Sequence, residues 1–318
     1  MKKVLAALPN YSKYCAKAKA YLEENGCEVI ENTTGGPLSQ EQLKELVSDI
    51  DGAVAGVEVW NEEILSAAPK LKVLARFGVG VDNYDLEAAK RHGVVCTNCP
   101  GVNAVSVAEH AVMLMLNLLR ECPQLNQETK QGQWRRLMVT ELHGKTVGLL
   151  GFGAVARNVA TILRGFSCHI LAYDPYPNEA AAKELGVTMC SREEVLQQSD
   201  ILSVHVPAMP ETYHFIGKEA IALCKDGVYI VNTSRGVNAD EAAVCEALES
   251  GKIAGYGSDV FEHEPVTKDT PIFKYPNYIC TPHTAAESYE NYAETGMRTA
   301  DAILDVLYRN QNPWHRLV

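Results

Sequence analysis

The chain has 318 residues, too many for one ordinary hydrophobic core and about right for two α/β domains. Hydrophobic residues make up 47% and charged residues 22% of it, as in a soluble globular protein. The formal net charge of −11 predicts a surface that repels nucleic acid and anionic membranes, so neither is an expected partner. No apolar run reaches the roughly 18 residues of a membrane helix, and the N-terminus lacks a signal-peptide core, so we expect a cytoplasmic protein.

The first hundred residues alternate short β-rich runs with helical patterns, which is typical of βα units around a parallel sheet. Between these runs, Ser39 and Gln42 have the spacing of a capping box, and Asn61 is suited to cap the next helix. This part of the chain predicts a small doubly wound domain. Its expected strands are residues 3–7, 53–56, 72–77 and 94–97.

The pattern breaks at Pro100 and Gly101, and residues 105–119 then form a helix that is apolar on nearly every side. We expect such a helix to be buried all round, between domains or between subunits. Residues 121–143 are more polar and read as an arm or loop.

From Lys145 onward, strands and helices alternate again, with near-continuous apolar strands that need helices on both faces. A long amphipathic helix is expected beyond Ala285. The expected strands of this second domain are residues 146–150, 169–174, 201–206, 227–232, 253–258 and 278–281.

The stretch VGLLGFGAVARNVA, which begins at Val147, places glycines between an expected strand and an expected helix. Gly151, Gly153 and Ala156 match the G-x-G-x-x-G/A form, whose small residues let the backbone approach a pyrophosphate at a helix N-terminus. The helix opens at Ala154 and Val155, and both are expected cofactor contacts together with Val206 at the end of a later strand.

An acidic residue follows at the spacing expected for binding the ribose hydroxyls. Asp174 lies 23 residues beyond Gly151 (174 − 151 = 23), at the end of the next strand. A carboxylate there repels a 2′-phosphate, and no arginine stands nearby to receive one, so the expected cofactor is NAD rather than NADP.

Three chemically active side chains follow later strands of this domain, where ligands of doubly wound sheets bind. They are Arg235 in NTSRG, Glu264 in SDVFEHEP and His283 in TPHTA. An arginine can hold a substrate carboxylate, a histidine can deliver a proton, and a carboxylate can orient that histidine and raise its pKa. Taken singly, each also fits a structural role: a strand-end ion pair, a surface acid before proline, or a capping histidine.

Other polar residues suggest no second chemistry. The spacing of Cys96 and Cys99 has no second pair, so no metal site is expected. His110 is expected to be a packed core residue, His205 to line the cofactor cleft, and His263 to be exposed.

Over essentially its whole length, the chain resembles the D-isomer-specific 2-hydroxyacid dehydrogenases. The stretches that carry the resemblance are GVGVDNYDLEAAK, GKTVGLLGFGAVARNVA, NTSRGVNADEAAVCEALESGKIAGYGSDVFEHEP and TPHTAAES. The resemblance implies a Rossmann-type NAD domain, residues 100–285, inserted into a flavodoxin-like substrate domain of residues 1–99 and 286–318. Both domains are then doubly wound parallel sheets.

The same resemblance implies roles for individual residues. Arg235, Glu264 and His283 become the catalytic trio, with His283 as the acid/base, and Thr233 and Asp259 contact the nicotinamide carboxamide. Backbone N–H groups of Gly78, Val79 and Gly80 bind the substrate carboxylate. A homodimer and a cleft that closes by hinge motion are also implied.

The substrate is less sharply indicated. Within the family the chain looks most like the D-3-phosphoglycerate dehydrogenases without a C-terminal regulatory domain, so 3-phosphoglycerate and 3-phosphohydroxypyruvate are the first expectation. Arg76, Arg135 and Arg136 are candidates to bind the phosphate. Many such enzymes have an arginine where this chain has Gly56, followed by Glu58, and this departure keeps hydroxypyruvate or glyoxylate open as alternatives.

Two rival functions share the scaffold. One is an NAD-sensing corepressor that binds NADH without turnover, and the other is formate or phosphite oxidation. No peptide-docking extension supports the first, and Glu264 fits the second less well.

Overall fold

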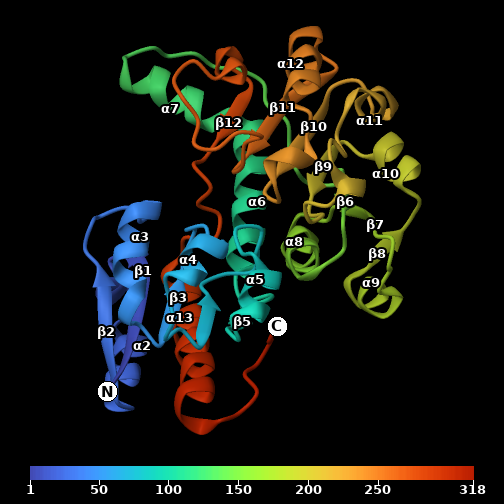
Figure 1. The fold of residues 1–318 in the computed structure, drawn as a ribbon. Coiled ribbons are helices and arrows are strands. Elements are labelled where there is room, and N and C mark those ends of the chain that lie inside the picture. The colour runs from blue at the N-terminus through green and yellow to red at the C-terminus, as the bar shows by residue number, and fades with distance from the viewer. The chain divides into compact units, whose positions relative to one another are not determined.

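The computed structural model describes residues 1–318, which divide into two compact units (Figure 1). Unit 1 consists of Met1–Asn103 and Glu287–Val318, and unit 2 is the segment Ala104–Ala286 between them. Unit 1 is therefore discontinuous in sequence.

Unit 1 contains a five-stranded parallel sheet in the order β2-β1-β3-β4-β5, the order of flavodoxin-like folds. Successive side chains of β1 enter opposite cores, Val4 on one face and Leu5 on the other, as the pleat of a strand dictates. The strands are β1 Lys2–Pro9, β2 Cys27–Asn32, β3 Gly52–Ala55, β4 Val73–Arg76 and β5 Val95–Thr97.

Helices cover both faces of this sheet. α3, α4 and α5 pack on one face, and α1, α2 and α13 on the other. The expected caps are present, since Ser39 and Gln42 form a capping box and Asn61 Oδ1 accepts from Ile64 N–H. The bounds are α1 Tyr11–Tyr14, α2 Ala16–Glu24, α3 Gln40–Leu46, α4 Glu62–Ser66, α5 Leu86–Arg91 and α13 Tyr289–Leu304.

Unit 2 contains a seven-stranded parallel sheet in the order β12-β11-β10-β9-β6-β7-β8. Counted from β6, the order is that of a Rossmann sheet with one strand added at the β12 edge. The strands are β6 Thr146–Leu150, β7 His169–Tyr173, β8 Val187–Met189, β9 Ile201–Val204, β10 Val228–Asn232, β11 Ile253–Ser258 and β12 Tyr278–Cys280.

The sheet of unit 2 also has a core on each face. α6, α8 and α9 contribute to one, and α10, α11 and α12 to the other. The bounds are α6 Ala104–Arg120, α7 Cys122–Lys130, α8 Ala154–Leu163, α9 Glu179–Leu185, α10 Arg192–Gln198, α11 Lys218–Leu223 and α12 Glu241–Ser250. Short 3₁₀ turns are Val47–Asp49, Arg164–Phe166, Pro210–Thr212, Gly236–Asn238 and Pro271–Lys274, and a π turn Asp305–Arg309 follows α13.

The fold class predicted from the sequence is confirmed, with three local corrections. Strands β2 and β8 were not predicted, because both lie at sheet edges and are short or half-polar. The segment interpreted as an arm contains helix α7. Helix α6 is not buried on every side within this chain, since Val105 and Met113 are exposed.

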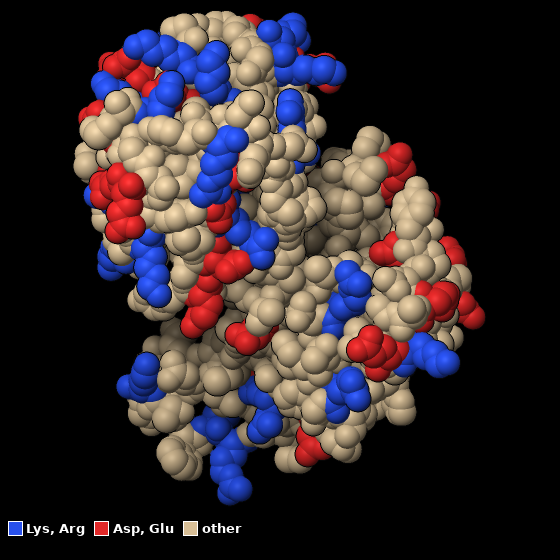
Figure 2. Space-filling model, turned by 90° about the horizontal axis from the view of Figure 1, so that it is seen from below, with Lys and Arg blue, Asp and Glu red and all other residues tan.

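Two further features concern the charge on the surface and the length of the apolar helices. On the face shown in Figure 2, basic and acidic side chains are interspersed rather than gathered by sign. No helix is both long enough and apolar enough to span a membrane.

Candidate active site

The turn after β6 lies where the chain order of the unit 2 sheet reverses, between β6 and β9, which is where doubly wound sheets bind ligands. Gly151 has a φ of +95°, and a Cβ on it would lie 2.8 Å from the backbone oxygen of His205, which follows β9. Only glycine fits both the conformation and the space. The turn is therefore built by local backbone geometry, as the sequence motif predicts.

The N-terminus of α8 is open to an anion. Gly153 is its N-cap residue and has no side chain to bond the first-turn N–H groups, so those of Ala154 and Val155 are not capped by a side chain. A Cβ on Gly153 would meet nothing within 4 Å. Both features fit a pyrophosphate that approaches the backbone closely.

Asp174, directly after β7, lies against this turn. Its Oδ2 accepts from Phe152 N–H at 2.8 Å and its Oδ1 from Tyr176 N–H at 2.8 Å. The carboxylate thereby lies beside the glycine turn, where an NAD ribose is expected.

The other expected cofactor contacts follow β9 and β10. Val206 is buried, and its carbonyl accepts from Asn238 Nδ2 at 2.9 Å. The hydroxyl of Thr233 is buried without a hydrogen-bond partner. A buried hydroxyl of this kind needs a partner, and a nicotinamide carboxamide would supply one, so these residues fit NAD.

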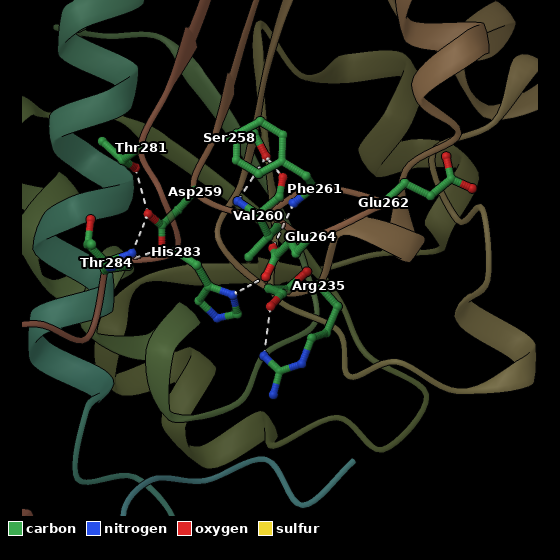
Figure 3. A network of polar contacts seen from close by, with 12 residues as sticks. Arg235, Ser258, Asp259, Val260, Phe261, Glu262, Glu264, Thr281, His283 and Thr284 are labelled. Atoms are coloured by element: carbon green, nitrogen blue, oxygen red, sulfur yellow. Dashed lines mark hydrogen bonds and ion pairs between the residues drawn. The ribbon is translucent and has the colours of Figure 1, made fainter. Parts of the chain in front are cut away.

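The strongest titratable pair of the site joins His283 to Glu264. His283 Nδ1 lies 2.8 Å from Glu264 Oε2, while Glu264 Oε1 accepts from Phe261 N–H at 2.9 Å (Figure 3). The hydrogen bond to Glu264 raises the pKa of His283 above its ordinary value and outweighs burial, which lowers it. Burial raises the pKa of Glu264, but its hydrogen bonds to His283 and Phe261 outweigh this and leave that pKa below its ordinary value. The imidazole is therefore biased toward the protonated form.

Asp259 holds the loop that carries His283. Only 1% of the residue is exposed, and its carboxylate accepts from the N–H groups of Thr284 and Ala285, each at 2.8 Å. Its own carbonyl accepts from His283 N–H at 2.8 Å, and His283 takes a left-handed φ of +56°. Asp259 thus positions the histidine, while its contact with a nicotinamide stays a prediction.

A second layer of the same network reaches helix α6. The hydroxyl of Thr281 lies 2.6 Å from Asp259 Oδ1 and 2.7 Å from His110 Nε2. His110, interpreted from sequence as a core residue, is thus half-buried and tied to the loop of His283. The tie joins residues far apart in the chain, and no local signal reveals it.

Arg235 lies beside the histidine and the glutamate (Figure 3). Its positive charge lowers the pKa values of Glu264 and His283, which places all three side chains within electrostatic reach. Two residues that we did not single out in the sequence hold the backbone on either side of Arg235. Asn232 accepts from Ser234 N–H and donates to the carbonyl of Arg235, and a Cβ on Gly236 would lie 1.9 Å from the backbone oxygen of Phe261.

The local signals for these two residues are weak. An asparagine at a strand end followed by Thr-Ser favours an Asx turn, and the glycine after Arg235 indicates close backbone approach. Asn232 and Gly236 could therefore have been singled out from the sequence. The close approach of Phe261 to Gly236 could not, because it joins two separate segments of the chain.

Sequence-predicted substrate residues lie in unit 1. The carbonyls of Val79 and Gly80 accept from Asn98 Nδ2 and Arg76 Nε, each at 2.8 Å. The N–H groups of Val79 and Gly80 make no hydrogen bond within the chain, whereas that of Gly78, also expected to bind the carboxylate, donates to the carbonyl of Arg76 at 3.0 Å. The loop therefore exposes donors that suit a carboxylate. Arg76 itself bonds backbone carbonyls, including that of Gly56 at 2.5 Å.

The other arginines and histidines considered in the sequence lie outside the network of His283 and Glu264. Arg135 pairs with Glu128 at 2.8 Å and lies 3.7 Å from Glu121, and Arg136 is exposed. Burial lowers the pKa of His205 to about 4, so this histidine is neutral near pH 7. His263 is exposed, as expected. No cluster of three or more His, Cys, Asp or Glu side chains could hold a metal ion.

Comparison with known proteins identifies the family. Residues 112–285 match the profile of the D-isomer specific 2-hydroxyacid dehydrogenase, NAD binding domain. A D-3-phosphoglycerate dehydrogenase of Archaeoglobus fulgidus is 40% identical over 307 residues, 96% of this chain and 57% of that protein. A glyoxylate reductase of Korarchaeum cryptofilum is 36% identical over 84% of this chain and 83% of that protein.

Solved structures agree. The apo-structure of D-lactate dehydrogenase from Escherichia coli superposes with a TM-score of 0.86 at 30% identity and covers 100% of both chains. The chain spans about half the length of the phosphoglycerate dehydrogenases it matches. The sheet orders, the glycine turn and these similarities together show that the chain belongs to the D-isomer specific 2-hydroxyacid dehydrogenase family and contains its NAD-binding domain.

Proposed function

We propose that the protein is an NAD-dependent oxidoreductase that interconverts a small D-2-hydroxy acid and the corresponding 2-oxo acid. The observation that carries the proposal is the pair of His283 and Glu264, 2.8 Å apart at the strand ends of the NAD-binding unit, with Arg235 beside it. An acid/base with a raised pKa next to an arginine is what reduction of a ketone beside a carboxylate requires.

Each member of the trio has a separate task. NAD, when bound, carries the hydride. Arg235 binds the substrate carboxylate and polarises the ketone oxygen, while His283 gives that oxygen a proton from Nε2, the nitrogen that does not face Glu264. Glu264 fixes the ring and keeps it protonated until the transfer.

The surrounding residues hold the two reactants. In unit 2 the turn that Gly151 allows brings the backbone of Gly153 and the N–H groups of Ala154 and Val155 to the pyrophosphate, and Asp174 binds the ribose. Val206 and Thr233 line the nicotinamide end. In unit 1 the N–H groups of Val79 and Gly80 bind the substrate carboxylate, which makes this unit the substrate domain.

Two substrates are candidates. The names of several relatives support 3-phosphoglycerate with 3-phosphohydroxypyruvate. A relative named glyoxylate reductase supports an unphosphorylated acid such as hydroxypyruvate or glyoxylate. The second also has support from geometry, because the guanidinium of Arg76 already bonds the carbonyls of Gly56 and Gly80.

NADH oxidation by the purified protein tests the proposal, with 3-phosphohydroxypyruvate, hydroxypyruvate, glyoxylate, pyruvate and 2-oxoglutarate as substrates. We expect turnover of at least one acid, and a fall in kcat of about 10²–10⁴-fold in His283→Ala, with NADH affinity nearly unchanged. His263→Ala, an exposed neighbour of Glu264, is the matched control. NADH binding without turnover of any acid would contradict the proposal and favour a binding protein.

A further inference from the structure

We propose that Glu58, just beyond the carboxyl end of β3, is a specificity-determining residue that disfavours substrates with a second anionic group such as a phosphate. The inference rests on the proposed function, because it names which 2-oxo acids the same site accepts. It favours small unphosphorylated acids over 3-phosphohydroxypyruvate.

The position of Glu58 in the sheet is the first argument. The chain order of the unit 1 sheet reverses between β1 and β3, so the loops that follow these two strands flank its topological switch point. Open α/β sheets bind their ligands at this point, beyond the carboxyl ends of the strands. Glu58 is the third residue after β3 and lies in one of the two flanking loops.

The burial pattern of this loop is inverted. Val57 and Val59 are 63% and 47% exposed, while Glu58 between them is only 4% exposed. Acidic side chains are rarely so buried, and valines are usually inside. The loop therefore presents two apolar side chains to its surroundings and keeps its one charged side chain inside, an exchange typical of functional sites.

Inside the loop, the carboxyl group of Glu58 occupies a donor that an external anion would need. Its Oε2 accepts from Gly56 N–H at 3.0 Å, at the end of β3. Burial raises the pKa of Glu58, against backbone hydrogen bonds from Leu38 and Gly56 and the charge of Arg76, which lower it. In either protonation state the group fills the place of an anion, and the ionised form also repels one.

The cations on the neighbouring elements do little to attract a phosphate to the place that Glu58 occupies. Arg76 donates from Nη1 to the carbonyl of Gly56 and from Nε to that of Gly80, so its hydrogen bonds tie the Glu58 loop to the 78–80 loop. In helix α1, which follows β1, the only cation is Lys13, whose Nζ lies 4.8 Å from the ring centroid of Tyr14. A phosphate at this switch point would meet Lys13 and the charge of Arg76, which the ionised carboxylate of Glu58 offsets.

The test compares kcat/KM for hydroxypyruvate and 3-phosphohydroxypyruvate, which differ only by the phosphate, in wild-type protein and in Glu58→Gln. Glutamine keeps the shape and the acceptor for Gly56 N–H but removes the charge. We expect the wild type to prefer hydroxypyruvate, and Glu58→Gln to raise the relative kcat/KM for the phosphorylated acid by about tenfold. Glu24→Gln, on the exposed face of α2, removes the same charge elsewhere in unit 1 and should leave the ratio unchanged.

The outcomes separate the two proposals. A wild-type preference for the phosphorylated acid, or an unchanged ratio in folded Glu58→Gln, overturns the role of Glu58 but leaves the dehydrogenase function intact. Turnover of neither acid, nor of any other 2-oxo acid, removes the proposed function and this inference with it. If Glu58→Gln does not fold, the wild-type preference alone decides, since a preference for the phosphorylated acid contradicts the proposal.

Discussion

At the scale of single residues, the ionisation of His283 is the property on which the proposed reduction depends. Its pKa is raised by Glu264, so the protonated imidazole persists to higher pH than an unpaired histidine would allow. Reduction needs that proton, so kcat/KM for the 2-oxo acid should fall as pH rises through the raised pKa. Removing the carboxylate should lower the pKa of His283.

We therefore predict that Glu264→Gln shifts the alkaline limb of the pH profile for reduction to lower pH. The measurement is kcat/KM of NADH-dependent reduction between pH 5 and 10, a range of about five units around the ordinary histidine pKa. Glu262→Gln is the control, because Glu262 pairs with His214, at 2.7 Å, rather than with His283. If the alkaline limb of the profile does not shift in Glu264→Gln, the limb reports the ionisation of a group other than His283.

At the scale of elements, the two glycines of the turn between β6 and α8 have different roles: one is needed for folding and the other for binding. Gly151 is required by conformation and by the backbone of His205, whereas Gly153 has open space around its missing Cβ and an ordinary φ of −76°. One glycine is therefore structural, and the other leaves room for the cofactor.

Alanine at each position should reveal the difference. Gly151→Ala strains the backbone by about 1–3 kcal/mol, which corresponds to a fall in Tm of about 2–4 °C per kcal/mol in a unit of this size. Gly153→Ala should leave Tm nearly unchanged but weaken NADH binding by about tenfold, because its methyl lies where the pyrophosphate approaches. Thermal unfolding and NADH fluorescence titration measure the two effects. Equal losses of Tm in both variants would refute the distinction.

The elements also show how far the sequence predicts this site. The glycine turn, the acid after β7 and the trio are visible in the chain because each depends on a local rule: a strand end, a short spacing or a residue type. The network of Asp259, Thr281 and His110 is not, because it joins β11, β12 and α6 through space. The edge strand β2 was missed because its residues are mostly half-exposed and lack the continuous apolar run of a central strand.

At the scale of the whole molecule, large apolar side chains are exposed on the segment between α7 and β6. Trp134 is 84% exposed and Met138 is 96% exposed, in a stretch without regular structure. An exposed tryptophan and an exposed methionine on one segment are typical of an association surface. The homodimer implied by family resemblance is therefore our prediction for the assembly.

Light scattering coupled to size exclusion measures the assembly directly. We expect a mass about twice that of the 34.8 kDa chain for the wild type, and a shift toward the single-chain mass in the double variant Trp134→Lys, Met138→Lys. Tyr176→Lys, an exposed aromatic outside this segment, serves as the control. A monomeric wild type would rule out the dimer.

The order in which the two units appear along the chain has a consequence for synthesis on the ribosome. Unit 2 lies wholly within residues 104–286, whereas helix α13 of unit 1, whose Ala300 and Ile303 are fully buried against β3 and β4 strand residues, is made after it. Domains fold as units while the chain emerges. The cofactor-binding unit can thus be complete, and able to hold NAD, while the first hundred residues still wait for the helix that closes their core.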